Sequence, residues 1–559
     1  MPSILWRIPV NKVVIAARAC LTRQKAVALG FQVDKAAHKK AMEENAGVVD
    51  AAAKKMELLA LHGEAVAELV EQSIDTTNDS FKYDPKPMEV SVVAIWCGRR
   101  KGFFEYIDKS FYVECEQSPD AENPKNHIGL VFDKTPFYAE QGGQIFDIGC
   151  VRNSSSSFTM DVEAVKVYGG YVVHYGTPKG LLKLNESLNV EIDMKRRALV
   201  MNNHTSTHLC NFSLRSTLGD HVEQQGSDVF AHRFRFDFSH GKPLTVDELE
   251  EMDERVRKII LQDLPVYDKE VPLDEAKQIC GVRQMFGEAY PDPVRVVSVG
   301  VSVDDLLANP TSEEWKNYAI EFCGGTHTPS SNAPITFTTI NEEAKSKGVR
   351  RIVCLTGQEA LDALQASKDY KTRMEAALEG KTRSALSTTV ADLLKELDSL
   401  KNFPYCDKSR FRQALADAKK TATAQMKEQE KEFKKIAADF AKETGAQLKE
   451  SDQKFLVARL DIGSNCGVLK NTIKSMQKQK MIPICLLSFC DGKVSVSASS
   501  TKAALGTLPA NKWVSTTVSS VNGKGGGKPD AAQGVCTNVN EENVQAMMDA
   551  ANEFASQNI

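Results

Sequence analysis

Two pairs of candidate metal ligands lie far apart in the chain and share one spacing. His204 and His208 are four residues apart, which places both imidazoles on one face of a helix. Cys323 and His327 are also four residues apart, but the Gly324–Gly325 pair between them favours a tight loop. Three imidazoles and one thiolate form the donor set that suits zinc best. The spacing leaves open whether such a site is structural or keeps a coordination position free for catalysis.

The residues around each pair predict the elements that would position these ligands. A helix is expected over 195–218, with a basic start and apolar residues that can form a buried face. A strand is expected over 230–238, with three phenylalanines on one face and Arg233 and Arg235 on the other. Those arginines either lie on a solvated face or contact phosphate. A capping box at 245–248 opens a further helix, and a helix near Leu273 and strands at 290–297, 336–339 and 348–353 follow it.

The segment from about 88 to 195 shows short alternating runs separated by turn residues, which is typical of a small antiparallel β-barrel or sandwich. The stretch 133–144 (DKTPFYAEQGGQ) lies within it. Its paired glycines allow the backbone to approach a ligand closely, and the alternative interpretation is a simple hairpin turn. The strands expected here are 90–96, 111–113, 127–132, 158–167 and 170–174.

The second half of the chain predicts a helical hairpin followed by another mixed unit. Leucines and other apolar residues step by three and four from 386 to 426, with a break at 403–407, as in an antiparallel coiled coil. From 455 onward, strands at 482–489 and 494–498 and a basic helix at 469–480 indicate an α/β domain. The loop 522–533 combines flexible glycines with Lys524 and Lys528, which favours either a phosphate cradle or a linker.

Composition sets broad limits on function. A chain of 559 residues has room for about three to five domains, and a net charge of −4 gives no global attraction to nucleic acid. Thirteen cysteines without a paired framework indicate a reducing compartment. Residues 1–33 carry five basic side chains and no acid, which predicts an organellar transit segment, a basic helix of the mature protein or an incomplete start of the reading frame.

The segments 201–215 (MNNHTSTHLCNFSLR) and 321–327 (EFCGGTH) resemble the editing domain shared by alanyl-tRNA synthetases and free-standing alanyl-tRNA editing proteins. The resemblance extends from about residue 110 to the end, with further matching pieces at 133–144, 290–297, 348–353 and 522–533. It implies an α+β multidomain protein that corresponds to the C-terminal half of the synthetase. The expected domains are a helical N-terminal remnant (1–87), a β-barrel (88–195), a zinc-binding editing domain (196–356), a helical hairpin or coiled coil (357–450) and a C-terminal tRNA-binding α/β domain (451–559).

The resemblance also implies roles for individual residues. Cys323 is tied to editing, and as a zinc-bound thiolate it would be a ligand and not a nucleophile. Thr135 would help to distinguish the hydroxyl of serine from the methyl group of alanine, since a site built around a hydroxyl rejects analogues that lack it. Gln225, or its neighbour Gln224, would contact the aminoacyl end of the tRNA. The residues expected to bind tRNA elsewhere are Arg196, Arg197, Lys524, Gly526 and Lys528.

The implied activity is zinc-dependent hydrolysis of Ser-tRNA(Ala) or Gly-tRNA(Ala) in the cytoplasm, or in mitochondria if the N-terminus is a transit segment. The partner is tRNA(Ala) with an acylated 3′ end, and the hairpin or C-terminal domain would also support a homo-oligomer. No aminoacylation domain or ATP-binding signature is recognised upstream of the barrel. A partial reading frame of a complete ATP-dependent alanine–tRNA ligase is therefore one alternative. The others are a non-catalytic tRNA-binding protein with a structural zinc and a threonyl-tRNA synthetase-type editing module, against which the glycine-rich loop argues.

Overall fold

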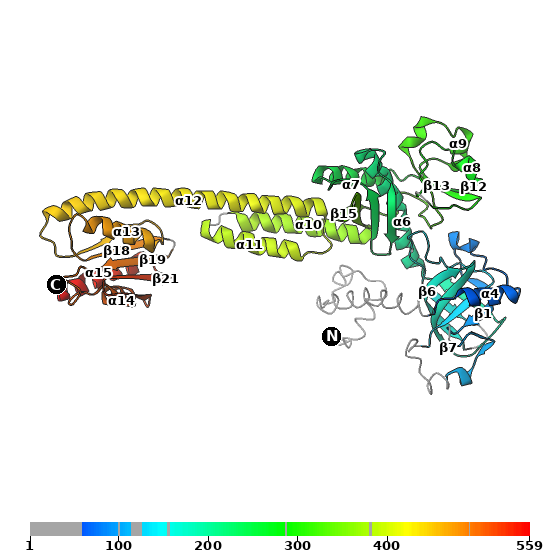
Figure 1. Ribbon diagram of the computed structural model, residues 1–559, viewed down its shortest axis with the longest axis horizontal. Helices are drawn as coiled ribbons and strands as arrows, with labels where there is room; N and C mark the ends of the chain where they lie inside the picture. Colours follow the sequence, from blue (N-terminus) through cyan, green and yellow to red (C-terminus); the bar gives the residue numbers. More distant parts are fainter. Residues whose placement is uncertain are drawn as a thin grey trace, which may run out of the picture. The chain divides into compact units, whose positions relative to one another are not determined.

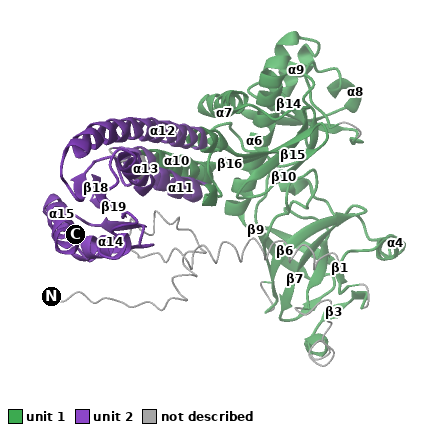
Figure 2. Cartoon of the chain, turned by 60° about the vertical axis from the view of Figure 1, so that its left-hand side comes forward, with its two compact units in different colours: residues 1–373, 398–411 green, residues 374–397, 412–559 purple. Residues whose placement is uncertain are grey.

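The computed structural model describes residues 59–98, 101–112, 126–153, 157–285, 288–379, 383–490 and 492–559. The chain divides into two compact units, the first comprising residues 1–373 and 398–411 and the second residues 374–397 and 412–559 (Figures 1 and 2). Both units are mixtures of helices and β-sheets, which confirms the expected α+β multidomain class. The boundaries of the five domains expected from the sequence stay a prediction.

A closed antiparallel β-barrel forms the N-terminal part of unit 1, as expected. Six strands follow one another in the order β1-β4-β7-β6-β5-β9, and β9 pairs back onto β1, while β2 extends the edge. Closure removes the exposed edges that an open sheet would present. The strands are β1 (Met88–Trp96), β2 (Phe103–Phe104), β4 (Ile128–Phe132), β5 (Gly149–Arg152), β6 (Thr159–Tyr168), β7 (Tyr171–Lys179) and β9 (Ser187–Ile192), and a short pair, β3 (Tyr106–Ile107) and β8 (Leu182–Lys183), lies beside them.

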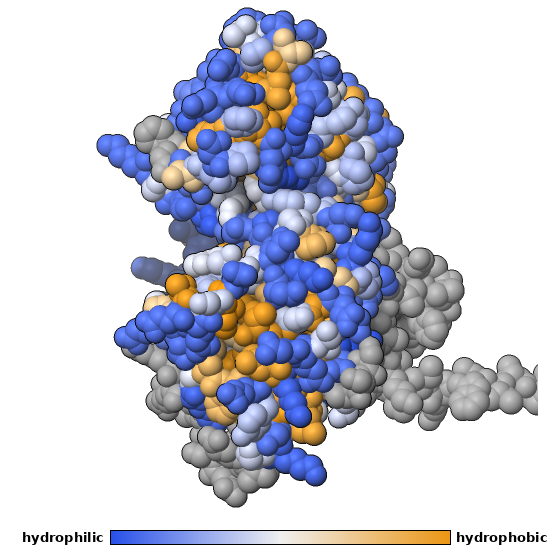
Figure 3. Space-filling view, turned by 90° about the vertical axis from the view of Figure 1, so that its right-hand side faces the viewer, coloured by the Kyte–Doolittle hydropathy of each residue, from blue (hydrophilic) through white to orange (hydrophobic). Residues whose placement is uncertain are grey.

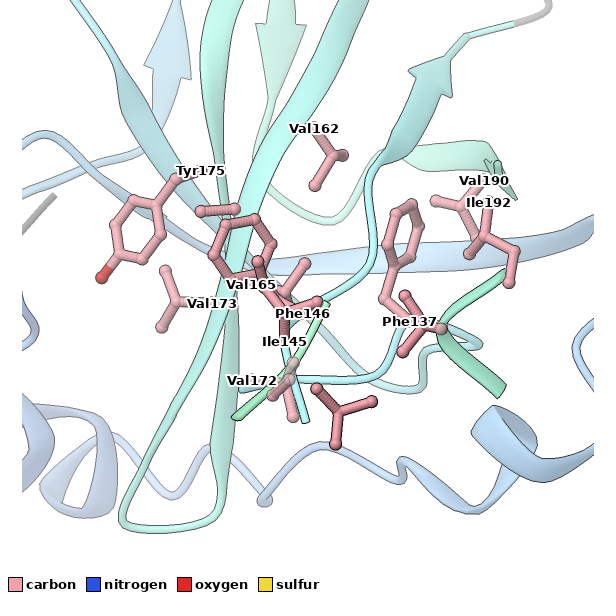
Figure 4. Packing of buried hydrophobic residues seen from close by; sticks show 14 of the residues in the cluster. Phe137, Ile145, Phe146, Val162, Val165, Val172, Val173, Tyr175, Val190 and Ile192 are labelled. Carbon is pink, nitrogen blue, oxygen red and sulfur yellow. The ribbon is translucent and has the colours of Figure 1, made fainter. Parts of the chain in front are cut away.

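Alternating side chains fill the barrel interior. Along β9, Leu188, Val190 and Ile192 are buried while the residues between them are exposed, which is the period-two pattern of a half-buried strand. Figure 4 shows Val190 and Ile192 packed with Phe137, which comes from the connection between β4 and β5. Burying each such side chain contributes about 1.5–3 kcal/mol. The barrel is therefore a packed core that can hold the 133–144 connection in a fixed position.

One strand expected in this region is wrong. Residues 109–112 form a helical turn instead of a strand at Phe111, and Val113 lies outside the described residues. The cause is local, because the carboxylate of Asp108 accepts hydrogen bonds from the backbone amides of Ser110 (2.8 Å) and Phe111 (3.2 Å). A side chain that caps the first amides of a turn in this way favours helix over strand.

The central helix α6 (Met194–Leu218) leaves the barrel and runs alongside a four-stranded antiparallel sheet (Figure 1). The side chain of Asp193 caps it by accepting from the amides of Lys195 and Arg196. The sheet has the order β10-β11-β16-β15, and Phe234, Phe236 and Phe238 are all fully buried on one face, as expected. Its strands are β10 (Gln224–Val229), β11 (Phe234–Ser239), β15 (Phe337–Ser346) and β16 (Val349–Thr356).

The expected strand over 230–238 is correct only from Phe234 onward. Val229 pairs with Phe234, and the amide of Phe230 donates to the carbonyl of Arg233 at 3.0 Å, so residues 230–233 form the turn of a hairpin. The alternating pattern of the sequence continued through this turn and concealed it.

A second, smaller sheet completes unit 1 on the other side of α6. It has the order β12-β13-β14, and the helices α8 and α9 pack on it around Val296, Leu306 and Ile320. The expected capping box at Thr245 and Glu248 is present and opens α7. The elements are α7 (Val246–Leu261), β12 (Val266–Val271), α8 (Leu273–Ala276), β13 (Val294–Val299), α9 (Val303–Ala308), η2 (Glu313–Asn317) and β14 (Ala319–Phe322). Figure 3 shows a face of unit 1 on which apolar side chains gather mainly over the barrel half.

Unit 2 is built on a five-stranded sheet with the order β17-β18-β19-β21-β20. The expected basic helix is α13, and its face of Leu469, Ile473 and Met476 is buried against the C-terminal part of α12. Lys524 and Gly526 lie on an edge strand, β20, and not in a loop as expected, because this segment pairs with β21. The elements are α11 (Arg383–Ser399), α12 (Tyr405–Glu450), β17 (Leu456–Arg459), α13 (Cys466–Gln477), β18 (Ile484–Cys490), β19 (Lys493–Ser499), α14 (Ala510–Ser519), β20 (Lys524–Gly527), β21 (Ala531–Thr537) and α15 (Glu541–Asn558).

The helical prediction after residue 357 is confirmed by α10 (Gly357–Leu378), α11 and α12. The break between α11 and α12 spans residues 400–404 and overlaps the predicted break at 403–407 only in part. Near the N-terminus the structure describes α4 (Gly63–Glu71) and η1 (Ser80–Tyr83), whereas the predicted transit segment lies outside the described residues. The eleven cysteines within the described ranges are all free. None of the helices in the described part of the chain is both long and apolar enough to cross a bilayer.

Candidate metal centre and cavity

One face of α6 carries a row of polar side chains. His204, His208, Asn211 and Arg215 follow at intervals of four, three and four residues, so a period of 3.6 brings all four onto one side. His204, His208 and Asn211 are buried although they are polar. Polar groups are rarely buried without partners, so this face must meet other polar groups or a ligand.

The loop after β14 supplies the other two ligands. The carbonyls of Cys323 and Gly325 accept hydrogen bonds from Nη1 of Arg295 at 3.0 and 2.7 Å. A Cβ added to Gly325 would lie 2.0 Å from Cε1 of His204, so only glycine permits the loop to approach the helix this closely. The tight turn expected between Cys323 and His327 is therefore present, and it brings these side chains onto α6.

All four predicted ligands come together. One donor atom from each of His204, His208, Cys323 and His327 can be chosen so that all lie within 4.8 Å of one another. The Cys323 Sγ lies 3.4 Å from Nε2 of His204 and 3.4 Å from Nε2 of His327. These four side chains could together hold a metal ion.

Two further side chains orient the imidazoles, and sequence reasoning missed both. Nδ1 of His204 lies 2.6 Å from Oε1 of Gln144, which also accepts from the amide of Thr326 at 2.9 Å. The hydroxyl of Thr205 lies 3.3 Å from Nδ1 of His327. Such partners fix the ring orientation and leave the opposite nitrogen directed at the metal position. Gln144 reaches the centre from the barrel, 60 residues before His204, so no local spacing could reveal it.

Burial sets the charge state of the centre. It lowers the pKa of His204 to about 3, with a smaller contribution from the nearby charge of Arg295. Burial likewise lowers the pKa of His208 and His327, and it raises the pKa of Cys323 to about 12. Neutral imidazoles are the form that binds a metal, and a bound cation would itself deprotonate the thiol.

Two features of these four side chains favour zinc as their ligand. Three imidazoles and one thiol are the ligand types that zinc takes in four-coordinate protein sites. In addition, Nδ1 of His208 is buried and has no hydrogen-bond partner among the described residues. A buried ring nitrogen without a partner costs free energy unless a ligand occupies it.

A cavity of about 760 Å³ opens beside this centre. Its volume lies in the range of sites for nucleotide-sized ligands. His204, His208 and Cys323 line it together with Asn211 and Glu321. The carboxylate of Glu321 accepts a hydrogen bond from Asn211 at 2.9 Å and lies 3.4 Å from His208, and burial raises its pKa to about 7. Sequence analysis named neither residue, although Asn211 follows His208 by one helical turn and Glu321 precedes Cys323 by two positions.

Of the glutamines and the threonine expected in the pocket, only Gln224 lines the cavity. Gln224 lines the cavity, whereas Gln225 is exposed and does not. Thr135 is fully buried inside the barrel, where its hydroxyl lies 2.7 Å from Nε2 of His174 and accepts from the amide of Phe137 at 3.2 Å. It is not among the residues that line the cavity.

Arg197, expected to contact phosphate, lies away from the surface in this structure. Its side chain is 1% exposed and is held by Asp147 and by the carbonyls of Lys82 and Pro136. This arginine therefore joins the start of α6 to the barrel. Arg196 is partly buried and lies over the ring of Phe146.

The C-terminal residues of the predicted tRNA contact belong to unit 2. Lys524, Gly526 and Lys528 are exposed on β20 and on the turn that follows it. An edge strand leaves one row of backbone amides and carbonyls unpaired by the sheet.

Comparison with known proteins gives the family. A family model described as tRNA synthetases class II (A) matches residues 20–196, and the DHHA1 domain model matches residues 452–557. The cytoplasmic alanine–tRNA ligase of Dictyostelium discoideum is 38% identical over 521 residues, which are 90% of this chain and 52% of the relative. The chain belongs to the alanyl-tRNA synthetase family.

Other members of the alanyl-tRNA synthetase family match to similar extents. The cytoplasmic alanine–tRNA ligase of Drosophila melanogaster is 34% identical over 90% of this chain and 52% of the relative. The mitochondrial enzyme of Saccharomyces cerevisiae is 38% identical over 64% of this chain and 35% of the relative. A solved structure of the C-Ala domain from Aquifex aeolicus alanyl-tRNA synthetase covers 17% of this chain and 87% of that domain, with 19% identity and a TM-score of 0.15. The chain thus spans about half the length of the curated relatives it matches.

Proposed function

We propose that this chain hydrolyses the ester bond of tRNA(Ala) mischarged with serine or glycine, with one zinc ion bound by His204, His208, Cys323 and His327. The observation that carries the proposal is the convergence of these four ligands beside a cavity large enough for an acylated adenosine. An ester at the 3′ end of a tRNA is already activated. The site therefore has to select the tRNA, select the wrong amino acid and admit water.

The residues of the cavity have distinct tasks in this proposal. Asn211 and Glu321 carry buried oxygen acceptors beside the metal group, which suits them to bind the ammonium group of the aminoacyl ester. Gln144 and Thr205 hold the rings of His204 and His327. When bound, Zn²⁺ supplies a Lewis acid that can polarise a carbonyl or lower the pKa of a water molecule.

Discrimination against correctly charged tRNA rests on the polar cavity wall. A ligase pocket rejects an analogue with one additional hydroxyl only weakly, so a second site that accepts the hydroxyl removes the error. Gln224 is the member of the predicted glutamine pair that faces the cavity, and its Nε2 donates to Ser227 at 3.1 Å. Thr135 would act indirectly, since its contact with His174 fixes the connection that carries Gln144.

The test is deacylation of Ser-tRNA(Ala) and Ala-tRNA(Ala) by the purified chain, beside a Cys323→Ala variant. We expect faster release of serine than of alanine, and loss of serine release in the variant. Cys280→Ala is the matched control, because Cys280 is a free cysteine of the same unit that does not line the cavity. Equal release of both amino acids, or an unaffected Cys323→Ala variant, would refute the proposal. Retained zinc without deacylation would support a non-catalytic tRNA-binding protein.

A second candidate function is ATP-dependent charging of tRNA(Ala). It is favoured by the printed names of the relatives, which are alanine–tRNA ligases, and by their length, of which this chain spans about half. An assay for alanine- and ATP-dependent charging of tRNA(Ala) by the chain distinguishes the two activities.

A further inference from the structure

Two arginines line the cavity at some distance from the metal group. Arg215 and Arg283 both belong to its wall. The Nε atoms of both side chains are buried and have no hydrogen-bond partner among the described residues. Arg283 makes no hydrogen bond or salt bridge through its side chain within that part of the molecule, although the carboxylates of Glu321 and Asp220 act on it through space. Nη1 of Arg215 donates to the carbonyl of Val222 at 3.3 Å and its Nη2 contacts Asp220, whereas the partly buried guanidinium of Arg283 has no such partner among the described residues. A largely desolvated guanidinium without partners is costly, so this pair is suited to an anion.

The charges around the pair do not neutralise it. Nη2 of Arg215 lies 3.1 Å from Asp220, whose side chain is 97% exposed, and such an exposed ion pair contributes little. Burial, and to a smaller extent the neighbouring charge of Arg215, lower the pKa of Arg283 to about 10. Glu321 is the buried acid of the cavity wall, and it is already hydrogen-bonded to Asn211. The other acids of the wall are exposed to water, namely Glu223, Glu270, Glu288 and Asp292.

The two arginines have a defined place relative to the metal group. Arg215 follows His208 by seven residues on the same face of α6, which is about 10 Å along the helix axis. The backbone of Arg283 bridges to Glu321, with its amide donating to Ile320 at 2.9 Å and its carbonyl accepting from Phe322 at 3.0 Å. Arg283 therefore lies one strand spacing from β14, about 4.8 Å, and Cys323 follows at the end of that strand.

We propose that Arg215 and Arg283 form a subsite for the phosphodiester that joins the last two nucleotides of the RNA 3′ end. The proposal rests on the proposed function, since it places the acylated nucleoside between the metal group and the arginines. A guanidinium matches the two free oxygens of a phosphodiester with paired hydrogen bonds. The carboxyl group of the amino acid is not an alternative ligand during hydrolysis, because it is esterified and uncharged. Ester hydrolysis would then be coupled to recognition of a polynucleotide end instead of a free nucleoside.

The experiment compares one variant on two substrates. Arg283→Gln removes the charge of a side chain that makes no hydrogen bond to the described residues, so the fold should persist. We expect the KM for Ser-tRNA(Ala) to rise about tenfold or more, with kcat unchanged, because hydrogen bonds to charged groups contribute strongly. The kinetic constants for seryladenosine, which lacks a phosphate, should stay unchanged, and Arg283→Lys should restore part of the KM. Arg255→Gln is the control, since Arg255 is exposed on α7 and pairs only with Glu251 among the described residues.

Direct binding separates this inference from the proposed function. Wild-type chain should bind a CCA trinucleotide more tightly than adenosine, and Arg283→Gln should remove that difference even if the chain hydrolyses nothing. Displacement of CCA by inorganic phosphate at equal concentration would assign the arginines to a free anion and overturn the proposal. An equal effect of Arg283→Gln on Ser-tRNA(Ala) and seryladenosine, or no effect on either, would also overturn it. Absence of hydrolysis by the wild type with intact CCA binding would refute only the proposed function.

Discussion

At the scale of single residues, the metal group combines what spacing reveals with what only folding brings together. The four ligands could be predicted because their types and intervals, on a helix and in a glycine turn, are local properties of the sequence. Gln144 could not, because its amide reaches His204 from the barrel, 60 residues earlier in the chain, and a glutamine carries no signal of that role. The same limit applies to Arg283, whose contact with β14 depends on the fold.

Replacement of Gln144 should weaken metal binding without removing a ligand. Gln144→Ala deletes the acceptor that holds Nδ1 of His204, so the ring is free to rotate and its tautomer is no longer fixed. We expect zinc affinity to fall about tenfold to a hundredfold, measured by competition with a chromogenic chelator.

Gln141→Ala is the matched control for this variant. It changes the same residue type in the same connection, and its side chain makes no hydrogen bond to the metal ligands among the described residues. Equal zinc affinity of Gln144→Ala and Gln141→Ala would show that Gln144 does not orient His204.

At the scale of elements, one carboxylate ties three strands of the four-stranded sheet together. Asp237 on β11 is fully buried and accepts hydrogen bonds from Arg351 on β16 at 2.7 and 2.9 Å and from Lys345 on β15 at 2.7 Å. Nη1 of Arg235 adds a bond at 2.5 Å. The alternation of β11 predicted the buried phenylalanines, but the partner of Arg235 could not be predicted, because strand pairing decides which charges meet. Arg235 is thus engaged within the sheet.

Asp237→Asn should destabilise unit 1 by about 3 kcal/mol, since breaking a buried charge pair leaves its cations uncompensated. Thermal or urea unfolding of the zinc-loaded chain measures the loss. Asp228→Asn is the control, because Asp228 is partly exposed and pairs only with Arg235 among the described residues. A similar small effect of both substitutions would contradict the assigned role.

The same carboxylate predicts an acid dependence of stability. Burial acts to raise the pKa of Asp237, but hydrogen bonds from Arg351 and Lys345 and the charge of Arg235 outweigh it and lower the pKa to about 2. A depressed pKa stabilises the folded state above the ordinary value of 3.8, and this contribution is lost as the pH falls through about 2. Unfolding free energies between pH 5 and pH 2 should therefore fall more steeply for the wild type than for Asp237→Asn.

At the scale of the whole molecule, the chain combines a barrel, a four-stranded sheet beside the candidate metal ligands and a five-stranded C-terminal sheet in two compact units. The sequence predicted long elements such as α6, α7 and α12, because periodicity and capping are local, but it did not predict the helices α14 and α15. It failed at Phe111 and at residues 230–233, where a side-chain cap and a hairpin turn override the alternating pattern. It also predicted a loop at Lys524, where glycines conceal a strand because they carry no side-chain pattern.

The exposed Lys524 on this edge strand and Lys528 on the turn after it should contribute to RNA affinity and not to catalysis. We expect the double substitution Lys524→Ala and Lys528→Ala to weaken tRNA(Ala) binding and to leave the single-turnover rate of bound Ser-tRNA(Ala) unchanged. Each lost phosphate contact should reduce the slope of log affinity against log salt by roughly 0.7–0.9. Binding titrations at several salt concentrations measure this.

The control for the lysine pair is the double substitution Lys493→Ala and Lys502→Ala, which removes two exposed lysines from the same unit. An identical salt slope for both double variants would argue against a specific contact at β20. A change in the rate of the bound substrate would place these lysines in the chemical step instead.

The measurement that tests the central claim most directly is the rate of Ser-tRNA(Ala) deacylation as zinc is added back to chelated protein. Four converging ligands predict a rate that is lost on chelation, rises in proportion to added Zn²⁺ and saturates at one ion per chain. The Cys323→Ala variant should show no such rise. A rate that is unchanged by chelation, or that is restored without regard to Cys323, would contradict the account.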